Sequence, residues 1–400
     1  MLMSGPGGPR SGEMKPAWMD EPPVQALLAA LAGGGIASRF VGGCVRNTVL
    51  GRPVGDIDIA VDKPPETVMR ALEAADLKVV PTGLKHGTVT AIVKGRPFEL
   101  TTLRRDVETD GRRAVVAFTD DWLADAGRRD FTFNALYADP DGTIWDPFDG
   151  RADLVAGKVR FIGDADTRIA EDHLRVLRFF RFYAWFGKPP LDGPSFNACR
   201  RNAGALGNLS GERVAKELLR LLAAPAPADA LEAMAEAGAL DHWLPEYCGT
   251  ERLRDLVARE DAPDPLRRLA AILVPPVTAA ARRLRLSTQD SLRLQLMLEP
   301  AVPSTRETLH TAIYRLGTSL FIDRLLLDGP TGWREALAVA RSWTPPSLPI
   351  GGADALALGL KPGPRVGVLL EAVERWWIDT DFSADRAACL AELERLAHTA

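Results

Sequence analysis

The sequence predicts an α+β protein, in which an amino-terminal mixed α/β domain is followed by an all-helical remainder. Short β-like runs alternate with helical stretches up to about residue 150, which is typical of a mixed α/β domain. From residue 168 onward the β signal fades, and apolar residues recur at helical spacing. A length of 400 residues is enough for about two or three domains.

The elements follow in chain order from apolar runs and their spacing. Helices are expected at 24–32 and 65–75, and strands at 39–41, 57–61, 88–93 and 98–102. Further helices are expected at 167–185, 210–222, 229–237, 266–273 and 365–377, separated by prolines and glycines. Residues 1–20 are rich in glycine and proline and are expected to be disordered. The sequence thus predicts a head over 21–150, a helical neck over 151–222, and a helical body and tail over 223–400.

The composition excludes several classes of protein. Apolar residues make up 46% and charged residues 26%, as in globular proteins. The net charge of −4 gives no global basic field, although local arginine clusters can still bind nucleic acid. The four cysteines are widely spaced without a CxxC pair, which disfavours a disulfide framework or a structural zinc site. No apolar run reaches about 18 residues, and the start lacks the features of a secretory signal. We therefore expect a cytoplasmic protein without a membrane span.

The segment FVGGCVRN at residues 40–47 reads as a strand that runs into two glycines and then a helix. Gly42 and Gly43 have no Cβ, so backbone N–H groups there can approach a phosphate closely. Arg46 lies one turn into the helix and can add a charge-assisted hydrogen bond. Taken alone, such a pair of glycines more often marks an ordinary turn.

The segment GDIDIAV at residues 55–61 places two acidic residues at alternate positions of a predicted strand. Asp56 and Asp58 would then share one face, because side chains two apart on a strand point the same way. A divalent cation such as Mg²⁺ would relieve the repulsion between their carboxylates. Glu99, in the strand FELTT at 98–102, could be a third carboxylate. Exposed acidic residues on a strand would give the same pattern.

Two further segments combine acidic residues with arginines. In RRDFTFNAL at 128–136, Arg128, Arg129 and Asp130 could contact phosphate and ribose, or form a solvated charge cluster at the start of a helix. In EDHLRVLRFFRF at 171–182, one acid and three arginines recur every three residues, at Asp172, Arg175, Arg178 and Arg181. An Asp and an Arg one turn apart can meet the Watson–Crick edge of a base, whereas solvated ion pairs are the ordinary alternative. Residues 160–220 hold eleven basic and seven acidic residues, so this part is locally basic.

The order and spacing of these motifs resemble the class II tRNA nucleotidyltransferase and bacterial poly(A) polymerase family. The resemblance covers about residues 36–225, and residues 351–367 look like the family's carboxy-terminal segment. It implies a polymerase-β-like nucleotidyltransferase head, Mg²⁺ as cofactor, and tRNA 3′ ends, CTP and ATP as partners. The implied activity is template-independent addition of CCA with release of pyrophosphate, by two-metal phosphoryl transfer.

The resemblance also implies a role for each motif residue. Asp56 and Asp58 would bind the metal, with Glu99 as the third catalytic carboxylate. The residues implied to bind the nucleotide are Gly42, Gly43, Arg46, Arg129, Asp130, Asp172, Arg175, Arg178 and Arg181. Within that set, Asp172 and Arg175 would read the base. SGER at 210–213, with Glu217, resembles a neck motif that braces helices. The glycine motif departs from the family at Asn47, where an Asp is usual.

Arginines of the helical part are candidates for contacts with RNA phosphates. They are Arg200, Arg201, Arg267 and Arg268, followed by Arg282, Arg283 and Arg285. Each could equally be an ordinary solvated arginine.

Poly(A) addition or a partial CC- or A-adding activity is the closest alternative function. A long basic carboxy-terminal extension, which is not seen here, would favour poly(A) addition. A non-catalytic RNA-binding relative is the alternative from another class, and loss of the Asp pair would favour it.

The first testable prediction concerns residues 104–118, whose charged, glycine-containing sequence suggests a mobile lever that helps the base-reading pair change from C to A. Shortening this segment should impair addition of A more than addition of C. Single-nucleotide incorporation into tRNA lacking its CCA end measures both steps. An equal loss of both would reject the lever.

Overall fold

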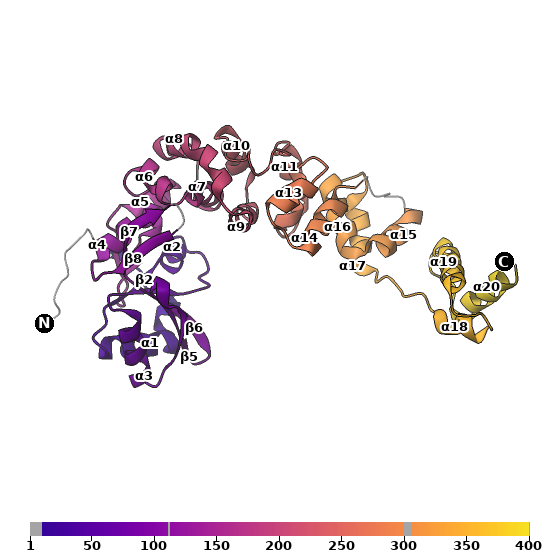
Figure 1. Ribbon diagram of the computed structural model, residues 1–400, viewed down its shortest axis with the longest axis horizontal. Coiled ribbons are helices and arrows are strands. Elements are labelled where there is room, and N and C mark those ends of the chain that lie inside the picture. Colours follow the sequence, from indigo (N-terminus) through magenta and orange to yellow (C-terminus); the bar gives the residue numbers. More distant parts are fainter. Residues whose placement is uncertain (1–9, 111–112, 300–305, 400) are drawn as a thin grey trace. The chain divides into compact units, whose positions relative to one another are not determined.

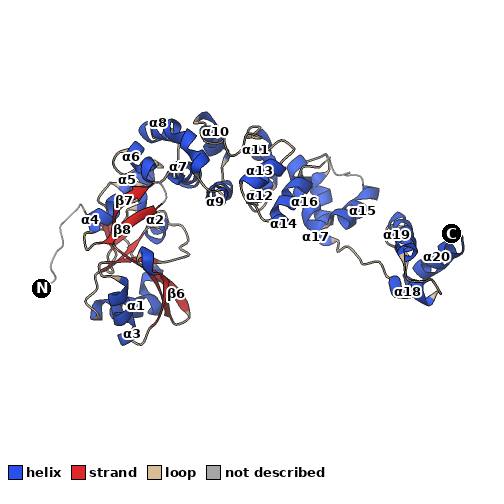
Figure 2. Ribbon diagram, viewed as in Figure 1, coloured by secondary structure: helices blue, strands red, loops and turns tan. Residues whose placement is uncertain are grey.

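The computed structural model describes residues 10–110, 113–299 and 306–399. The chain divides into two compact units, Met1–Pro245 and Glu246–Ala400 (Figure 1). The boundaries expected at residues 150 and 222 both fall inside the first unit. The strands drawn in red in Figure 2 belong to this unit, and helices make up most of the rest. The expected α+β fold class, a mixed α/β head followed by helices, is therefore confirmed.

The head is built on an eight-stranded sheet of order β1-β10-β9-β2-β3-β6-β5-β4. Its strands are β1 (Arg10–Glu13), β2 (Ser38–Val41), β3 (Asp58–Val61), β4 (Lys78–Gly83), β5 (Thr88–Val93), β6 (Arg96–Thr102), β9 (Tyr137–Ala138) and β10 (Thr143–Trp145). Neighbouring strands are antiparallel except β3 and β6, which are parallel. The four strands expected from the sequence are present as β2, β3, β5 and β6.

Helices α1 (Pro22–Gly33) and α3 (Pro65–Ala74) pack against each other and against the sheet. Both begin with proline, whose fixed φ suits the first helical turn. The buried residues of α1 recur at helical spacing, with Leu27, Leu28 and Leu31 at 8% exposure or less. This is the amphipathic pattern that predicted the helix.

The other helices of the first unit surround the carboxy-terminal part of the head and continue from it. They are α2 (Gly43–Val49), α4 (Trp122–Gly127), α5 (Gly150–Ala156), α6 (Ala165–Glu171), α7 (Leu174–Phe186), α8 (Gly193–Asn202), α9 (Gly211–Leu222) and α10 (Ala228–Glu236). Short 3₁₀ turns lie at η1 (Ala17–Asp20), η2 (Leu84–His86), η3 (Thr132–Asn134) and η4 (Ala203–Asn208). Strands β7 (Arg104–Asp110) and β8 (Arg113–Phe118) form a separate antiparallel hairpin. The segment 104–118 is therefore largely a hairpin, and its residues 111–112 lie outside the described residues.

Two expectations for this unit were wrong. Residues 10–20 are not disordered, because β1 pairs with β10 and the Met14 N–H donates to the Gly142 carbonyl oxygen at 2.8 Å. Residues 1–9 lie outside the described part of the chain. The single helix expected at 167–185 is instead α6 and α7, since Asp172 adopts an extended backbone (φ −156°, ψ 105°). Its carboxylate accepts a hydrogen bond from the Leu174 N–H at 3.1 Å, which begins the second helix.

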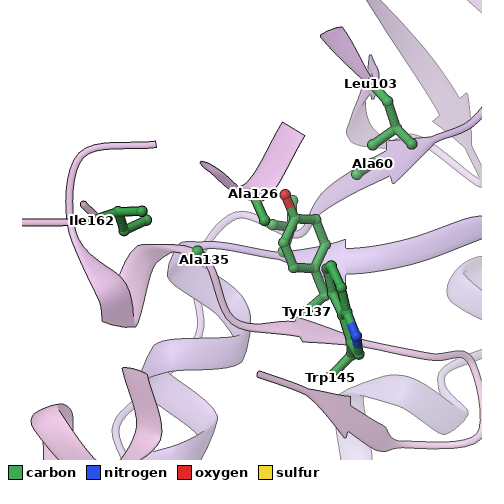
Figure 3. Close-up of a cluster of buried hydrophobic side chains, with 8 residues drawn as sticks. Ala60, Leu103, Ala126, Ala135, Tyr137, Trp145 and Ile162 are labelled. Atoms are coloured by element: carbon green, nitrogen blue, oxygen red, sulfur yellow. The ribbon is translucent and has the colours of Figure 1, made fainter. Parts of the chain in front are cut away.

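A cluster of phenylalanines joins the head to α7. Phe131 is fully buried, and its ring lies 4.7 Å from Phe161, 5.3 Å from Phe182 and 6.4 Å from Phe179, measured between centroids. A second core cluster includes Tyr137 of β9 and Trp145 of β10, whose rings pack against each other (Figure 3). The first cluster fixes α7 against the segment that follows α4, and this arrangement positions the site described below.

The second unit is helical. Its helices are α11 (Glu251–Arg259), α12 (Pro265–Ala271), α13 (Thr278–Arg283), α14 (Thr288–Met297), α15 (Arg306–Leu316), α16 (Thr318–Asp328), α17 (Trp333–Ser342), α18 (Gly352–Ala357), α19 (Pro364–Asp379) and α20 (Arg386–Thr399). A core around Val373, Trp377 and Leu393 packs α19 against α20. Among the described helices of the whole chain, none has the length and apolar character that crossing a membrane requires.

The second prediction tests the phenylalanine cluster. Phe131→Ala should lower the free energy of unfolding by about 3–5 kcal/mol, because it removes a fully buried ring and leaves a cavity. Urea unfolding followed by circular dichroism measures the change. Leu123→Ala, at a position that is 53% exposed, is the control and should change stability by less than about 0.5 kcal/mol. Equal effects of the two substitutions would contradict a structural role of the cluster.

Candidate active site

Three carboxylates lie at the start of β3 and on its neighbour β6. The parallel register places Asp58 opposite Glu99, and Asp56 lies in the loop just before β3. Asp58 is half-buried, whereas Asp56 and Glu99 are exposed. Burial raises the pKa of Asp58, and the negative charges of Glu99 and Asp56 raise it further. The three expected carboxylates are therefore neighbours, but Asp56 precedes the strand instead of sharing it with Asp58.

These carboxylates have the chemistry of a site for a hard divalent cation. Oxygen donors are the ligands that such cations prefer, and the repulsion felt by Asp58 is what a bound cation would relieve. Among the residues that the structure describes, no three His, Cys, Asp or Glu side chains are preassembled as a metal-binding cluster. The three carboxylates therefore fit a divalent cation, which would offset the repulsion among their negative charges.

The glycine turn connects β2 to α2 beside this acidic group. Gly42 adopts φ +71° and ψ −121° at the helix start, a conformation that favours glycine. Cys44 is buried, and its Sγ lies 3.3 Å from the Val41 carbonyl oxygen and 3.7 Å from that of Asp58. The turn is therefore fixed next to the start of β3.

Arg46 extends from α2 into the interior. It donates to Oδ1 of Asn134 at 2.7 Å, and its guanidinium lies 4.5 Å from the ring centroid of Phe186. Burial lowers the pKa of Arg46 to about 10, and the positive charge of Arg181 contributes to the same shift. The positive charge at this position is thus incompletely compensated within the protein.

A buried carboxylate orients the arginine pair that follows α4. Asp125 is 1% exposed and binds Nη2 of Arg128 at 2.7 Å and Nη2 of Arg129 at 3.1 Å. Tyr137 donates its hydroxyl to Asp125 at 2.6 Å and accepts from Nε of Arg129 at 2.9 Å. Asp125 was not among the residues predicted from the sequence, although its spacing of three and four residues from the two arginines is typical of ion pairs on a helix.

The buried Asp130 forms a second ion pair, with the half-buried Arg178. Nε of Arg178 donates to Oδ2 of Asp130 at 2.6 Å, and Asn134 Nδ2 donates to Oδ1 at 2.9 Å. Burial opposes the charged form, but Arg178 and the hydrogen bond from Asn134 lower the pKa of Asp130 to about 2. This pair connects the segment after α4 to the middle of α7.

Asp172 and Arg175 do not lie on one continuous helix as expected, and each has its own partner. Asp172 accepts from Arg213 of α9 at 2.7 Å, whereas Arg175 pairs with Glu171 at 2.5 Å. Arg175 also donates to the carbonyl oxygens of Arg168 at 2.9 Å and Arg128 at 3.1 Å. The break between α6 and α7 causes the difference, because it takes Asp172 off the helical face that carries the arginines.

These groups converge on one cavity of about 480 Å³. Its lining residues are Gly42, Gly43, Arg46, Arg128, Arg129, Asp130, Asn134, Asp172, Leu174, Arg175, Arg178, Phe182 and Arg213. All of the expected nucleotide-binding residues are among them except Arg181, which pairs with Glu217 at 2.5 Å and lines the neighbouring hollow. Arg128 was one of the two arginines proposed to contact phosphate, whereas Asn134 and Arg213 were not expected to line the cavity, since only tertiary packing brings them there.

The first four arginines expected to contact RNA divide into two pairs. Arg200 and Arg201 are exposed near the end of α8, and Arg201 pairs with Asp166 at 2.5 Å. Arg267 and Arg268 are only 8% and 3% exposed. Both bind Glu260, at 3.0 and 2.5 Å, and Arg267 also binds Asp323 at 3.1 Å. The expectation that Arg267 and Arg268 bind RNA was wrong, because both guanidiniums are buried and form ion pairs with carboxylates of the second unit.

Comparisons with known proteins agree with this geometry. The family profile described as "Poly A polymerase head domain" matches residues 38–160, and "Probable RNA and SrmB- binding site of polymerase A" matches 191–249. The mitochondrial CCA tRNA nucleotidyltransferase 1 of Danio rerio is 33% identical over 379 residues, which cover 89% of this chain and 87% of the relative. The CCA-adding enzyme of Streptococcus sanguinis is 32% identical, covering 92% and 96%. This chain belongs to the class II CCA-adding enzyme and poly(A) polymerase family.

A solved structure extends the similarity to the fold. The crystal structure of the Bacillus stearothermophilus CCA-adding enzyme in complex with CTP has a TM-score of 0.79 and 30% identity, covering 95% of this chain and 98% of that one. The chain is thus an RNA nucleotidyltransferase, and enzymes of this family use divalent metal ions. Membership of the family confirms the resemblance inferred from the motifs.

The third prediction follows from the low pKa of Asp130. Its folded value lies below the ordinary value of 3.8, so its contribution to stability is complete above about pH 4 and is lost as the pH falls toward 2. The unfolding free energies of the wild type and Asp130→Asn should therefore converge by about 2 kcal/mol over that range. Denaturant unfolding at several pH values measures this, with exposed Asp120→Asn as the control. A difference independent of pH would contradict the prediction.

Proposed function

We propose that this enzyme adds C, C and A to the 3′ end of tRNA without a nucleic-acid template, using CTP and ATP and releasing pyrophosphate. The observation that supports the proposal is that one cavity is lined by the residues to which we assign binding of phosphate, ribose and base. Arg46 and Arg129 line this cavity and also act electrostatically on Asp58. The cavity and the acidic group are therefore parts of one site.

Specificity for the base follows from the chemistry of Asp172 and Arg175. Cytosine and adenine each present an amino donor beside a ring-nitrogen acceptor, whereas uracil and guanine present a carbonyl beside an N–H. A carboxylate accepts and a guanidinium donates, so this pair of side chains complements C and A. Arg213 holds Asp172, and Glu171 with two carbonyl oxygens holds Arg175. The protein itself thus replaces a template base.

The remaining cavity residues position the nucleotide. The backbone at Gly42 and Gly43 would receive the triphosphate, with Arg46 and Arg129 supplying positive charge. Asp130, already ionised and held by Arg178, would accept a hydrogen bond from a ribose hydroxyl. Positioning and charge stabilisation of this kind account for most of the acceleration in phosphoryl transfer.

Mg²⁺ is the metal we propose for Asp56 and Asp58, with Glu99 as the third carboxylate. When bound, the metal would lower the pKa of the RNA 3′-hydroxyl and neutralise charge on the leaving pyrophosphate. The protein's own part is to hold Asp58 and Glu99 on adjacent parallel strands, with Asp58 within the electrostatic influence of Arg129 and Arg46. The cytoplasmic location stays a prediction, because the relatives include both mitochondrial and bacterial proteins.

The fourth prediction tests the function directly. The purified enzyme, given tRNA lacking its CCA end, Mg²⁺ and labelled nucleotides, should add two C residues and then one A. Asp56→Ala and Asp58→Ala should each slow incorporation more than about 1000-fold, because the metal-binding oxygens are lost. Glu66→Ala, at an exposed site on α3, is the matched control and should keep full activity.

Other products would change the assignment. Long A tracts would indicate a poly(A) polymerase, and addition limited to CC or to A would indicate a partial enzyme. An absence of incorporation by the folded wild type would favour a non-catalytic RNA-binding protein. Normal rates in either aspartate variant would reject the metal-centred mechanism.

A further inference from the structure

A second hollow of about 410 Å³ adjoins the nucleotide cavity and has no role in the reaction described above. Its lining residues are Arg46, Asn47, Arg52, Pro53, Arg181, Phe182, Trp185, Phe186, Arg220 and Ala223. Arg46 and Phe182 line both this hollow and the nucleotide cavity. We call it the basic–aromatic hollow. Whatever binds there lies directly beside the incoming nucleotide.

The lining carries positive charge without a matching carboxylate. It contains four arginines and no acidic residue, and within the described part of the chain Arg181 is the one among them that forms an ion pair, with Glu217. Arg52 and Arg220 are exposed, and neither forms an ion pair with any residue in the described part of the chain. Repulsion from Arg181 and Arg52 contributes to the lowered pKa of Arg46, after the larger effect of its burial. The hollow is therefore suited to an anion.

The aromatic residues distinguish this hollow from a simple phosphate site. Phe186 already lies under two guanidiniums, with its centroid 4.5 Å from Arg46 and 4.9 Å from Arg52. Trp185 is different, because its indole N–H donates to the Arg220 carbonyl oxygen at 2.8 Å while its ring stacks on no ring or guanidinium within the described residues. Trp185 is thus held in place and half-buried, with a ring that is free to stack on a ligand.

We propose that the basic–aromatic hollow binds the single-stranded 3′ end of the RNA, with a base stacked on Trp185 and its backbone phosphates on Arg52 and Arg220. Arginines interleaved with an aromatic platform are the usual means of binding a single strand without reading its sequence. Such tolerance suits an end whose last base changes as nucleotides are added. The inference rests on the proposed function, because it assigns the position of that enzyme's RNA substrate.

A bare pyrophosphate is the main competing ligand for this charge. The free indole ring favours a nucleotide, because pyrophosphate has no face on which Trp185 could stack. The position beside Arg46 also places an RNA end where its terminal hydroxyl can reach the neighbouring nucleotide cavity. The two ligands predict different results for the same variants.

The fifth prediction is that Trp185 contributes to RNA affinity and not to nucleotide affinity. Trp185→Ala should raise the Kd for tRNA lacking its CCA end about tenfold, whereas Trp185→Phe, which keeps a stacking ring, should raise it less than about threefold. The Kd for CTP, measured without tRNA, should be unchanged in both variants. Fluorescence anisotropy of end-labelled tRNA and thermal melting of each variant provide the readouts.

The arginines are tested through salt dependence. Arg52→Ala and Arg220→Ala should each reduce the slope of log Kd against log salt concentration by about 0.7, the value for one phosphate of a single strand. Arg70→Ala, at an exposed position on α3, is the matched control and should leave the slope unchanged. Both variants should keep their wild-type Kd for CTP.

Three results would overturn the proposal. One is an unchanged tRNA Kd in the folded Trp185→Ala variant. A second is a loss of CTP affinity equal to the loss of tRNA affinity, which would assign the hollow to the incoming nucleotide. A third is a weaker inhibition by pyrophosphate in Arg52→Ala with tRNA affinity intact. In each case the wild-type enzyme would still add CCA, so the failure is distinguishable from failure of the proposed function itself.

Discussion

The pairing of buried carboxylates with arginines is the interaction on which the site depends. Six arginines line one cavity of about 480 Å³, and so many like charges would repel one another or turn toward water without fixed partners. Asp125 holds Arg129, and Asp130 holds Arg178, so each guanidinium keeps one direction. Breaking such a pair costs more than a surface pair because it leaves an unpaired buried charge. The buried carboxylates therefore fix the orientation of the arginines that line the site.

The sheet provides the opposite side of the site. A single parallel pairing, β3 with β6, sets Asp58 beside Glu99, and the glycine turn after β2 lies next to them. The two halves carry opposite charge, since carboxylates dominate at the strands and arginines dominate at the helices. This separation suits a metal-bound triphosphate, in which cation and anion must be held side by side. The basic–aromatic hollow continues the positive half and gives the RNA a place beside the nucleotide.

Much of the fold and most of the site could be predicted from the sequence. Strand and helix periodicity located β2, β3, β5, β6, α1 and α3, because local apolar spacing reflects which face is buried. Most residues of the nucleotide-binding motifs line one cavity, because the glycine turn, the segment after α4 and α7 pack together there. Periodicity failed at Asp172, whose side chain ends one helix and begins the next. It also failed at Arg267 and Arg268, because helical spacing does not show whether a charge faces solvent or a buried partner.

The sequence by itself therefore determined the fold class, the family and the identity of the acidic and basic residues, because these depend on local patterns and on residue chemistry. Only the tertiary structure decided the partners of those residues. Arg213 reaches Asp172 from another helix, and Asp125 is joined to Tyr137 across the core of the head. Trp185 and Arg220, 35 residues apart in the sequence, meet at the wall of the hollow. Such contacts are set by how helices and sheet pack, and that packing depends on all the elements together.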